Sequence, residues 1–335
     1  MKKITFILLL LSSLSCLSIP QSYLSDHFDG KKYFNPNRPH PIGFTDFLKW
    51  QMTRQKASWP DFINDVVQIQ SIPKSENRIN IIFVNHATVL IQIGELNILT
   101  DPIWSDRASP FSFLGPKRVR KPGIEIEKLP PIHVILISHN HYDHLDLPTL
   151  QILSQKFNPL ILVPLGNQSW LKGEGIISNE LDWGQSQIVG EYKITFEKAY
   201  HWSARGMFDR FESLWGSFVV EGKGKKIYFA GDTGYGDHFK ELAKKYSFFD
   251  LSLIPIGAYE PRWFMKGHHL NPEDAILAHQ DLNSKRSLGI HYGTFQLADE
   301  GVNQPLEDLK MAREKYKIKE EDFVAAKNGE IFKVQ

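Results

Sequence analysis

The chain has 335 residues, of which 42% are hydrophobic and 23% charged, a composition typical of a globular domain rather than of disordered, collagen-like or coiled-coil chains. This length suffices for one large domain or two modest ones. The formal net charge is only +1. Proteins that bind a phosphate backbone usually carry a clear excess of positive charge, so we expect no nucleic-acid partner.

Residues 1–16 have the pattern of a secretory leader. Lys2 and Lys3 precede an apolar run that is too short to span a membrane, and small residues follow it. Cys16, the only cysteine, stands where a lipoprotein leader places its lipidated cysteine. We therefore expect a protein anchored by lipid in the bacterial cell envelope, with secretion as a soluble periplasmic protein as the alternative.

Residues 17–75 are rich in proline and aromatic residues and have no regular period. We interpret them as an arm that wraps around the following domain and ends in a short helix near residues 62–70. Residues 76–335 are predicted to form one catalytic domain.

Within this domain, short apolar and β-branched runs predict strands, and a period of 3.6 residues predicts helices. The strands are expected at 79–84, 89–93, 96–100, 132–137, 160–163, 192–199, 215–220, 226–230, 251–255 and 287–291. The helices are expected at 147–156, 238–245, 272–279 and 306–316, the third with Asn271 as N-cap and Pro272 in its first turn. The long segment 102–131 reads as a functional loop. This mixture predicts an α/β fold of stacked layers, with helices outside two packed sheets.

The segment Ser138-His139-Asn140-His141-Tyr142-Asp143-His144 follows the predicted buried strand 132–137. Alternate residues of an extended segment point the same way, so His139 and His141 can share one metal ion. As the chain turns, Asp143 and His144 reach a second position a few ångströms away. Two ions about 3.5–4 Å apart are typical of hydrolytic sites.

Three further metal-binding side chains follow predicted strands. His201 comes after the strand at 192–199, Asp232 after the strand at 226–230, and His291 ends the strand at 287–291. Loops at strand ends commonly carry functional residues. His86 lies in the first predicted hairpin, and we interpret it as a core or supporting residue rather than a ligand.

In kind and order, these seven residues resemble the ligands of the metallo-β-lactamase superfamily. The resemblance implies a four-layer αββα sandwich in which His139, His141 and His201 hold one ion. It also implies that Asp143, His144 and His291 hold the second, with Asp232 bridging both. Nitrogen and carboxylate ligands without a thiolate favour two zinc ions, with iron or manganese as alternatives. We expect Asp143, Asp232 and His291 to be catalytic as well.

Other strings narrow the resemblance. They are Trp104-Ser105-Asp106-Arg107, Gly115-Pro116-Lys117-Arg118, Gly231-Asp232-Thr233-Gly234-Tyr235, Pro255 to Met265, and Ile290 to Phe295. Together they resemble the family of N-acylphosphatidylethanolamine-hydrolysing phospholipases D, over roughly residues 34–333. The resemblance implies release of N-acylethanolamine and phosphatidate from a membrane phospholipid.

Two other readings remain open. The same site would suit hydrolysis of another ester, lactone or phosphodiester. A lipoprotein that binds lipid or metal without turnover is the non-enzymatic alternative.

The substrate is expected to lie at a membrane surface and to contact residues in the two segments that border the predicted site. The candidates are Trp104, Tyr259, Arg262, Trp263, Phe264 and His269. Apolar residues of these segments, with Phe111, Phe113, Leu114 and Met265, are equally compatible with an acyl-chain wall, a membrane-facing rim or plain core packing. The sequence leaves the oligomeric state open, and a homodimer is compatible with it.

Overall fold

The structure is a computed structural model that describes residues 25–36, 43–67, 69, 72 and 79–334. The predicted leader with Cys16 and parts of the predicted arm lie outside these residues. Within the described ranges, no helix has both the length and the apolar character needed to cross a bilayer.

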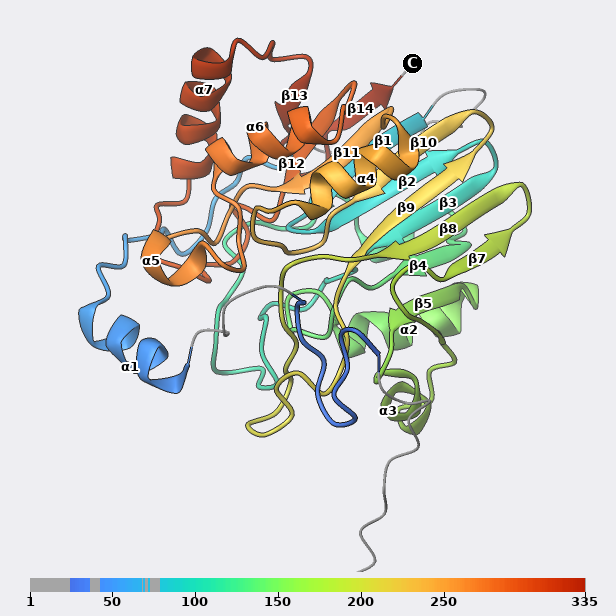
Figure 1. Cartoon of the computed structure of the whole chain (residues 1–335), viewed down its shortest axis with the longest axis horizontal. Coiled ribbons are helices and arrows are strands. Elements are labelled where there is room, and N and C mark those ends of the chain that lie inside the picture. Colours follow the sequence, from blue (N-terminus) through green and yellow to red (C-terminus); the bar gives the residue numbers. More distant parts are fainter. Residues whose placement is uncertain (1–24, 37–42, 68, 70–71, 73–78, 335) are drawn as a thin grey trace, which may run out of the picture.

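Two seven-stranded sheets form the centre of the molecule (Figure 1). The first has the order β14-β1-β2-β3-β4-β5-β6, with β14 (Ile331–Val334), β1 (Ile79–Asn85), β2 (Thr88–Ile93), β3 (Leu96–Thr100), β4 (Val134–Leu136), β5 (Leu160–Pro164) and β6 (Asn179–Leu181). The second has the order β13-β12-β11-β10-β9-β8-β7, with β13 (Phe323–Ala325), β12 (Ser287–Ile290), β11 (Leu251–Pro255), β10 (Lys225–Phe229), β9 (Ser217–Gly222), β8 (Tyr192–Glu197) and β7 (Ser186–Val189).

Helices cover the outer face of each sheet. The first sheet carries α2 (Leu147–Phe157) and α3 (Gln168–Gly173), and the second carries α4 (His238–Tyr246), α6 (Pro272–Asp281) and α7 (Gln304–Tyr316). The helices α1 (Phe44–Thr53) and α5 (Arg262–Met265) and the 3₁₀ helix η2 (Ile126–Lys128) lie in connections. The four-layer αββα sandwich of the metallo-β-lactamase type is therefore confirmed.

Three apolar clusters correspond to the three contacts between layers. Along β1, Ile81 and Phe83 belong to the cluster between the sheets, whereas Ile82 and Val84 belong to the cluster under α2 and α3. Because successive strand residues point to opposite faces, a strand buried on both sides needs an uninterrupted apolar run. Each such side chain stabilises the fold by about 1.5–3 kcal/mol.

Most predicted elements occur close to their expected bounds. The start of α6 agrees in detail, because Oδ1 of Asn271 accepts a hydrogen bond of 2.8 Å from the backbone N–H of Asp274, and Pro272 follows in the first turn. The predicted strand 132–137 is shorter than expected, since only its centre is paired as β4.

The prediction of a short helix near residues 62–70 was wrong for the residues that the structure describes. The N–H of Ile63 donates to the carbonyl of Val119, and the N–H of Val67 donates to that of Asn328. A backbone bonded to distant partners cannot also form helical hydrogen bonds. The helix of this region is α1 instead, which begins after Gly43, whose N–H is bound by Oδ2 of Asp46 at 2.9 Å.

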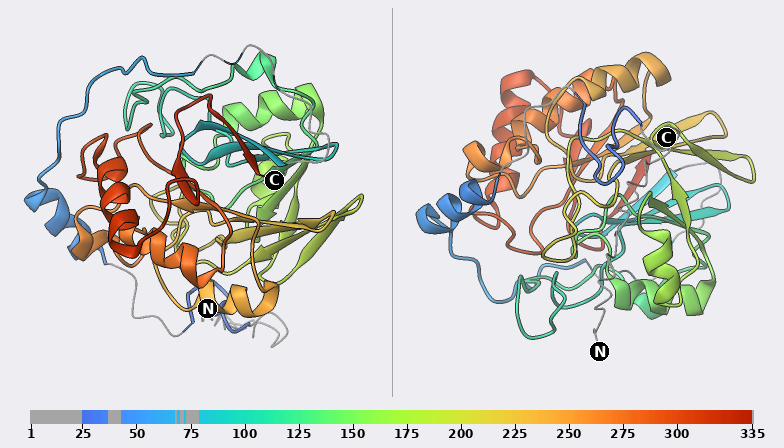
Figure 2. Two further views of the ribbon diagram at one scale, coloured as in Figure 1. Left: turned by 90° about the horizontal axis from the view of Figure 1, so that it is seen from above. Right: turned by 60° about the horizontal axis from the view of Figure 1, so that its bottom comes forward.

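Residues 25–36 form a small hairpin that packs against the sandwich. It turns at Gly30 and contains the isolated bridges Ser25–Phe28 and Phe28–Tyr33. The N–H of Tyr33 donates to the carbonyl of Phe211 at 2.8 Å, which places the hairpin beside the loop 203–213 (Figures 1 and 2). We call residues 25–36 the N-terminal hairpin.

Candidate metal centre

The seven predicted ligands meet at one end of the sandwich, and each lies just beyond the end of a strand. The segment from His139 to His144 follows β4 of the first sheet. His201, Asp232 and His291 follow β8, β10 and β12 of the second sheet. The cluster thus lies across the junction of the two sheets.

Two glycines allow the backbones around the ligands to approach closely. A Cβ on Gly231, which has a φ of +58°, would lie 2.5 Å from Cβ of Ser138, the residue before His139. A Cβ on Gly257 would lie 2.1 Å from the carbonyl oxygen of His291. His291 itself adopts a φ of 62°, an uncommon conformation for a residue with a side chain. Such conformations are often found at functional sites, where the surrounding packing holds them in place.

Three imidazole nitrogens converge at the first position. Nδ1 of His141 lies 2.8 Å from Nε2 of His139 and 3.3 Å from Nε2 of His201. Nε2 of His141 is buried and has no hydrogen-bond partner among the described residues. This arrangement of nitrogens facing one another suits a shared cation.

The second position gathers imidazoles and carboxylates. Nε2 of His291 lies 3.1 Å from Nε2 of His144 and 3.2 Å from Oδ2 of Asp143. Oδ2 of Asp232 lies 3.1 Å from Nε2 of His291, 3.3 Å from Nε2 of His144 and 3.8 Å from Nε2 of His201. Asp232 therefore lies between the two positions, and its buried Oδ1 has no hydrogen-bond partner in the described part of the chain.

The protonation states of the three imidazoles at the first position and of the Asp232 carboxylate suit metal ligands, whereas at His291 burial is outweighed by the neighbouring carboxylates, led by Asp232, which raise its pKa to about 9. Burial lowers the pKa of His141 to about 4 and holds the pKa values of His139 and His201 well below their usual range, so these imidazoles are neutral at pH 7. Burial alone would raise the pKa of Asp232, but the neighbouring histidines, led by His291, hold it well below its usual range. Neutral imidazoles and ionised carboxylates are the forms that bind divalent cations, so the cluster is able to bind metal ions.

Buried groups around the cluster fix the orientation of the imidazoles. Nδ1 of His144 lies 2.6 Å from Oδ2 of Asp101, and Nδ1 of His201 lies 3.0 Å from the carbonyl oxygen of His268. Nε2 of His86 lies 2.9 Å from Oδ2 of Asp143, in keeping with a supporting role. Such contacts orient an imidazole and raise its affinity for a metal. Asp101 was missed at the sequence level because Thr100-Asp101-Pro102 forms no recognisable motif.

The predicted substrate residues differ in where they lie. His269 joins the cluster, with Nδ1 3.7 Å from Oδ2 of Asp232. Arg262 instead pairs with Asp274 and donates to the carbonyl of His269, and the Tyr259 hydroxyl donates to Asp308.

The predicted tryptophans and Phe264 lie outside the cluster as well. The Trp104 indole donates to the carbonyl of Ile124, 2.9 Å away. Phe264 stacks on Trp50 with ring centroids 4.7 Å apart. Trp263 is 49% exposed at the surface.

Arg205 holds both ends of the segment that carries four of the candidate ligands. Its Nη1 donates to the carbonyl of Asn140 at 3.0 Å and to the carbonyl of Leu145 at 2.7 Å. The guanidinium also stacks on Tyr142, 4.1 Å from the ring centroid, and on Trp170. Asp209 accepts hydrogen bonds from the backbone N–H groups of Arg205 and Gly206. No motif in the sequence singles out Arg205, so its role was not predicted.

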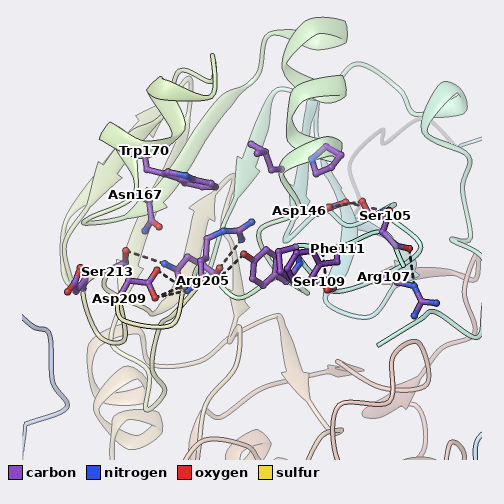
Figure 3. Close-up of a pocket in the computed structure, with 18 of the residues that line it drawn as sticks. Ser105, Arg107, Ser109, Phe111, Asp146, Asn167, Trp170, Arg205, Asp209 and Ser213 are labelled. Atoms are coloured by element: carbon purple, nitrogen blue, oxygen red, sulfur yellow. Dashed lines mark hydrogen bonds between the residues drawn. The ribbon is translucent and has the colours of Figure 1, made fainter. Parts of the chain in front are cut away.

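A cavity of about 950 Å³ borders the segment that carries four of the candidate ligands. Asn140 and Tyr142, from the ligand-bearing segment, form part of its wall. Figure 3 shows Arg205 between Trp170 on one side and Phe111 on the other, with Asp209 below. None of the seven candidate ligands lines this cavity, so it borders the segment that carries them rather than the metal positions themselves.

Comparison with known proteins agrees with this geometry. A family model described as "Beta-lactamase superfamily domain" matches residues 96–292. The chain is 41% identical to N-acyl-phosphatidylethanolamine-hydrolyzing phospholipase D 1 of Caenorhabditis elegans, over 77% of this chain and 76% of that protein. It is 40% identical to the mitochondrial N-acyl-phosphatidylethanolamine-hydrolyzing phospholipase D of Saccharomyces cerevisiae, over 65% of this chain and 48% of that protein.

Solved structures share the fold. A metallo hydrolase from the archaeon Ignicoccus hospitalis superposes with a TM-score of 0.59 at 17% identity, covering 77% of this chain and 99% of that one. A possible metal-dependent hydrolase from Veillonella parvula gives a TM-score of 0.62 at 13% identity, covering 77% and 99%. The chain belongs to the metallo-β-lactamase superfamily and, within it, to the family of the N-acyl-phosphatidylethanolamine-hydrolysing phospholipases D.

Proposed function

We propose that the protein is a dinuclear zinc phospholipase D that hydrolyses N-acylphosphatidylethanolamine to N-acylethanolamine and phosphatidate. The fold and the relatives establish a metal-dependent hydrolase. The observation that carries the finer proposal is a pair of adjoining groups of histidine and aspartate side chains in a chain that is 41% identical to an N-acyl-phosphatidylethanolamine-hydrolyzing phospholipase D.

In this proposal, His139, His141 and His201 hold one ion, Asp143, His144 and His291 hold the other, and Asp232 contacts both. A pair of divalent ions supplies Lewis acidity that activates water and offsets the charge of phosphoryl oxygens. An imidazole that binds a metal ion is neutral, so two divalent charges would outweigh the two carboxylates and leave the centre positive. A positive centre favours an anionic phosphodiester over a neutral ester. Zinc suits this set of nitrogen and carboxylate ligands.

Two exposed apolar loop tips support a membrane-facing orientation. Phe113 and Leu114 are 77% and 60% exposed, and they directly follow Pro110, Phe111 and Ser112, which line the cavity. Met207 and Phe208 are 89% and 86% exposed, between the cavity-lining Gly206 and Asp209. Apolar side chains at such tips can enter the boundary between lipid headgroups and acyl chains. We therefore place these two loop tips against the phospholipid surface.

The test is incubation with vesicles containing phosphatidylcholine, phosphatidylethanolamine or N-acylphosphatidylethanolamine, with products identified by mass spectrometry. We expect N-acylethanolamine and phosphatidate from the last lipid, and their loss in Asp232→Asn with unchanged circular dichroism. In ¹⁸O-labelled water, attack at phosphorus places the label in phosphatidate. Label in a free fatty acid instead would establish carboxyl-ester hydrolysis and overturn the phospholipase D assignment.

We also propose that Cys16, which lies outside the described residues, is lipidated and holds the protein on the cell envelope. One acyl chain binds a membrane only weakly, so stable anchoring needs a second chain or a second contact, which the apolar loop tips would supply. Mass spectrometry of the mature N-terminus tests the modification. An unmodified N-terminus at another residue would favour secretion of a soluble protein.

A further inference from the structure

The N-terminal hairpin reaches the metal centre through one side chain. Nδ2 of Asn35 donates to the backbone carbonyl of His201 at 2.9 Å. Oδ1 of the same amide accepts a hydrogen bond of 3.1 Å from the Trp215 indole N–H. The carbonyl requires a donor and the indole N–H an acceptor, so both partners together fix the orientation of the amide.

The contact between Asn35 and His201 lies beyond the end of β8, where hydrogen bonds of the sheet no longer hold the backbone. Strand β8 ends at Glu197, so the segment 199–201 is held by other groups. The Trp215 indole N–H also donates to the carbonyl of Ala199, the N–H of Tyr200 donates to Oγ1 of Thr233, and the N–H of Gly234 donates to the carbonyl of Tyr200. Those three bonds come from within the sandwich. The bond to His201 comes from Asn35, more than 160 residues earlier in the chain.

The hairpin itself is firmly packed, so it can hold Asn35 in place. His27 and Tyr33 are 5% and 9% exposed, and Nε2 of His27 lies 2.7 Å from Oδ1 of Asp182. The His27 ring stacks on Trp183 at 4.3 Å between centroids. The Trp183 indole donates to the carbonyl of Trp215, whose own indole binds Asn35. The hairpin and the end of β8 therefore share one hydrogen-bonded network.

We propose that Asn35 is a positioning residue for His201, and that the N-terminal hairpin is thereby a working part of the metal centre. The inference rests on the metal centre of the proposed function. The His201 imidazole is oriented at Nδ1 by the His268 carbonyl, while Asn35 fixes the backbone from which that imidazole projects. Groups that orient a ligand typically change metal affinity by about 10–100-fold.

Two substitutions separate this role from simple packing. Asn35→Asp keeps the size and the acceptor for Trp215 but replaces the donor with a second acceptor facing the His201 carbonyl. Asn35→Ala removes both bonds. If Asn35 only filled space, Asn35→Asp would hold zinc as tightly as the wild type. If Asn35 positions His201, Asn35→Asp should weaken zinc binding at least as much as Asn35→Ala. Phe34→Ala is the matched control, because Phe34 is the neighbouring residue of the hairpin and is 40% exposed.

The measurement is the rate at which zinc passes from the loaded full-length protein to a chromogenic chelator, with no substrate present. We expect one of the two ions to leave about tenfold faster in Asn35→Asp and Asn35→Ala, and at the wild-type rate in Phe34→Ala. Circular dichroism checks that each variant is folded. Asn35→Ser keeps a hydrogen-bond donor on a shorter side chain and should release zinc at an intermediate rate. It replaces Asn35→Asp or Asn35→Ala in the test if either of these fails to fold.

Release from Asn35→Asp at the wild-type rate would overturn the inference, as would equally fast release from Phe34→Ala. A wild-type protein that binds two ions but does not hydrolyse N-acylphosphatidylethanolamine would count against the proposed substrate and leave the role of Asn35 intact. Failure of the wild-type protein to bind metal would instead remove the basis of both proposals.

Discussion

Nδ1 of His144 lies 2.6 Å from Oδ2 of Asp101, and neither side chain is exposed to solvent. The Asp101 carboxylate also accepts hydrogen bonds from the backbone N–H and the hydroxyl of Ser138, at 2.7 and 2.6 Å. Asp101 thus links the start of the ligand-bearing segment to the imidazole at its end, and directs Nε2 of His144 toward the cluster.

Replacing Asp101 with Asn should lower zinc affinity by about 10–100-fold, because a neutral amide orients and polarises the His144 ring less strongly. Competition with a chelator measures this affinity. Asp250→Asn is the control, since Asp250 is also buried but pairs with Lys285. Equal affinity in the wild type and Asp101→Asn would contradict an orienting role for this carboxylate.

Replacing Arg205 with Met should release the two ends of the segment 140–145 and lower kcat/KM by about 100-fold, since a misplacement of 1 Å at an active site has effects of this size. Steady-state kinetics on N-acylphosphatidylethanolamine measures the loss. Arg210→Met is a suitable control, because Arg210 also stacks on two aromatic rings in the same loop. A similar loss in both variants would point to the loop as a whole rather than to the Arg205 contacts.

The double variant Phe113→Ser/Phe208→Ser should weaken binding to phospholipid vesicles. Each phenyl ring that enters the lipid contributes about 1.5–3 kcal/mol, so each loss should weaken binding by at least tenfold. Vesicle sedimentation in a Cys16→Ser background measures this without an anchor. Ile177→Ser/Ile188→Ser alters two other exposed apolar residues and should have no effect. Undiminished binding of the first variant would exclude the loop tips as membrane contacts.

Docking of the N-terminal hairpin should depend on pH through His27. Burial lowers the pKa of His27, but the hydrogen bonds and charges of Asp182 and Asp26 outweigh this and raise it above its usual value. A histidine in an unfolded chain titrates near pH 6.5. The contribution of His27 to stability is therefore complete below about pH 6.5 and is lost as the pH rises through the higher folded pKa.

His27→Gln should accordingly lower Tm more at pH 5.5 than at pH 8.5, as measured by thermal unfolding followed by circular dichroism. Asp26→Asn should have a smaller effect, because the Asp26 side chain is 87% exposed and its interaction with His27 is screened by solvent. A Tm difference independent of pH would show that His27 acts through its stacking on Trp183 rather than through its charge.

The strands and helices of the sandwich could be predicted where the hydrophobic or capping pattern of the element lies within its own sequence. The apolar run of β1 and the cap Asn271-Pro272 are local signals, and both elements occur as expected. Strands β6, β7, β13 and β14 have at most four residues and were not predicted. They form because a neighbouring strand offers hydrogen bonds, as β1 does to β14, and a short sequence does not reveal its neighbour.

The distinction between local signals and contacts with remote segments applies to the metal centre as well. The four closely spaced residues His139, His141, Asp143 and His144 stand out because metal chemistry requires those residue types at that spacing. Asp101, Arg205 and Asn35 act through contacts with segments remote in the sequence, and only the folded arrangement shows the partners of these side chains. The wrongly predicted helix near residues 62–70 has the same origin, since Val119 and Asn328 determine its backbone.

The two sheets contribute different members of each ligand group. At the first position, His139 and His141 follow a strand of one sheet and His201 a strand of the other, and at the second position His144 faces His291 in the same way. A chain in which only one sheet has formed therefore holds at most two of the three nitrogens that a tetrahedral zinc site needs. Hydrolytic activity would then arise only when the two halves join. If the enzyme hydrolyses membrane lipid, as we propose, this order of events would keep newly made, half-folded chains harmless.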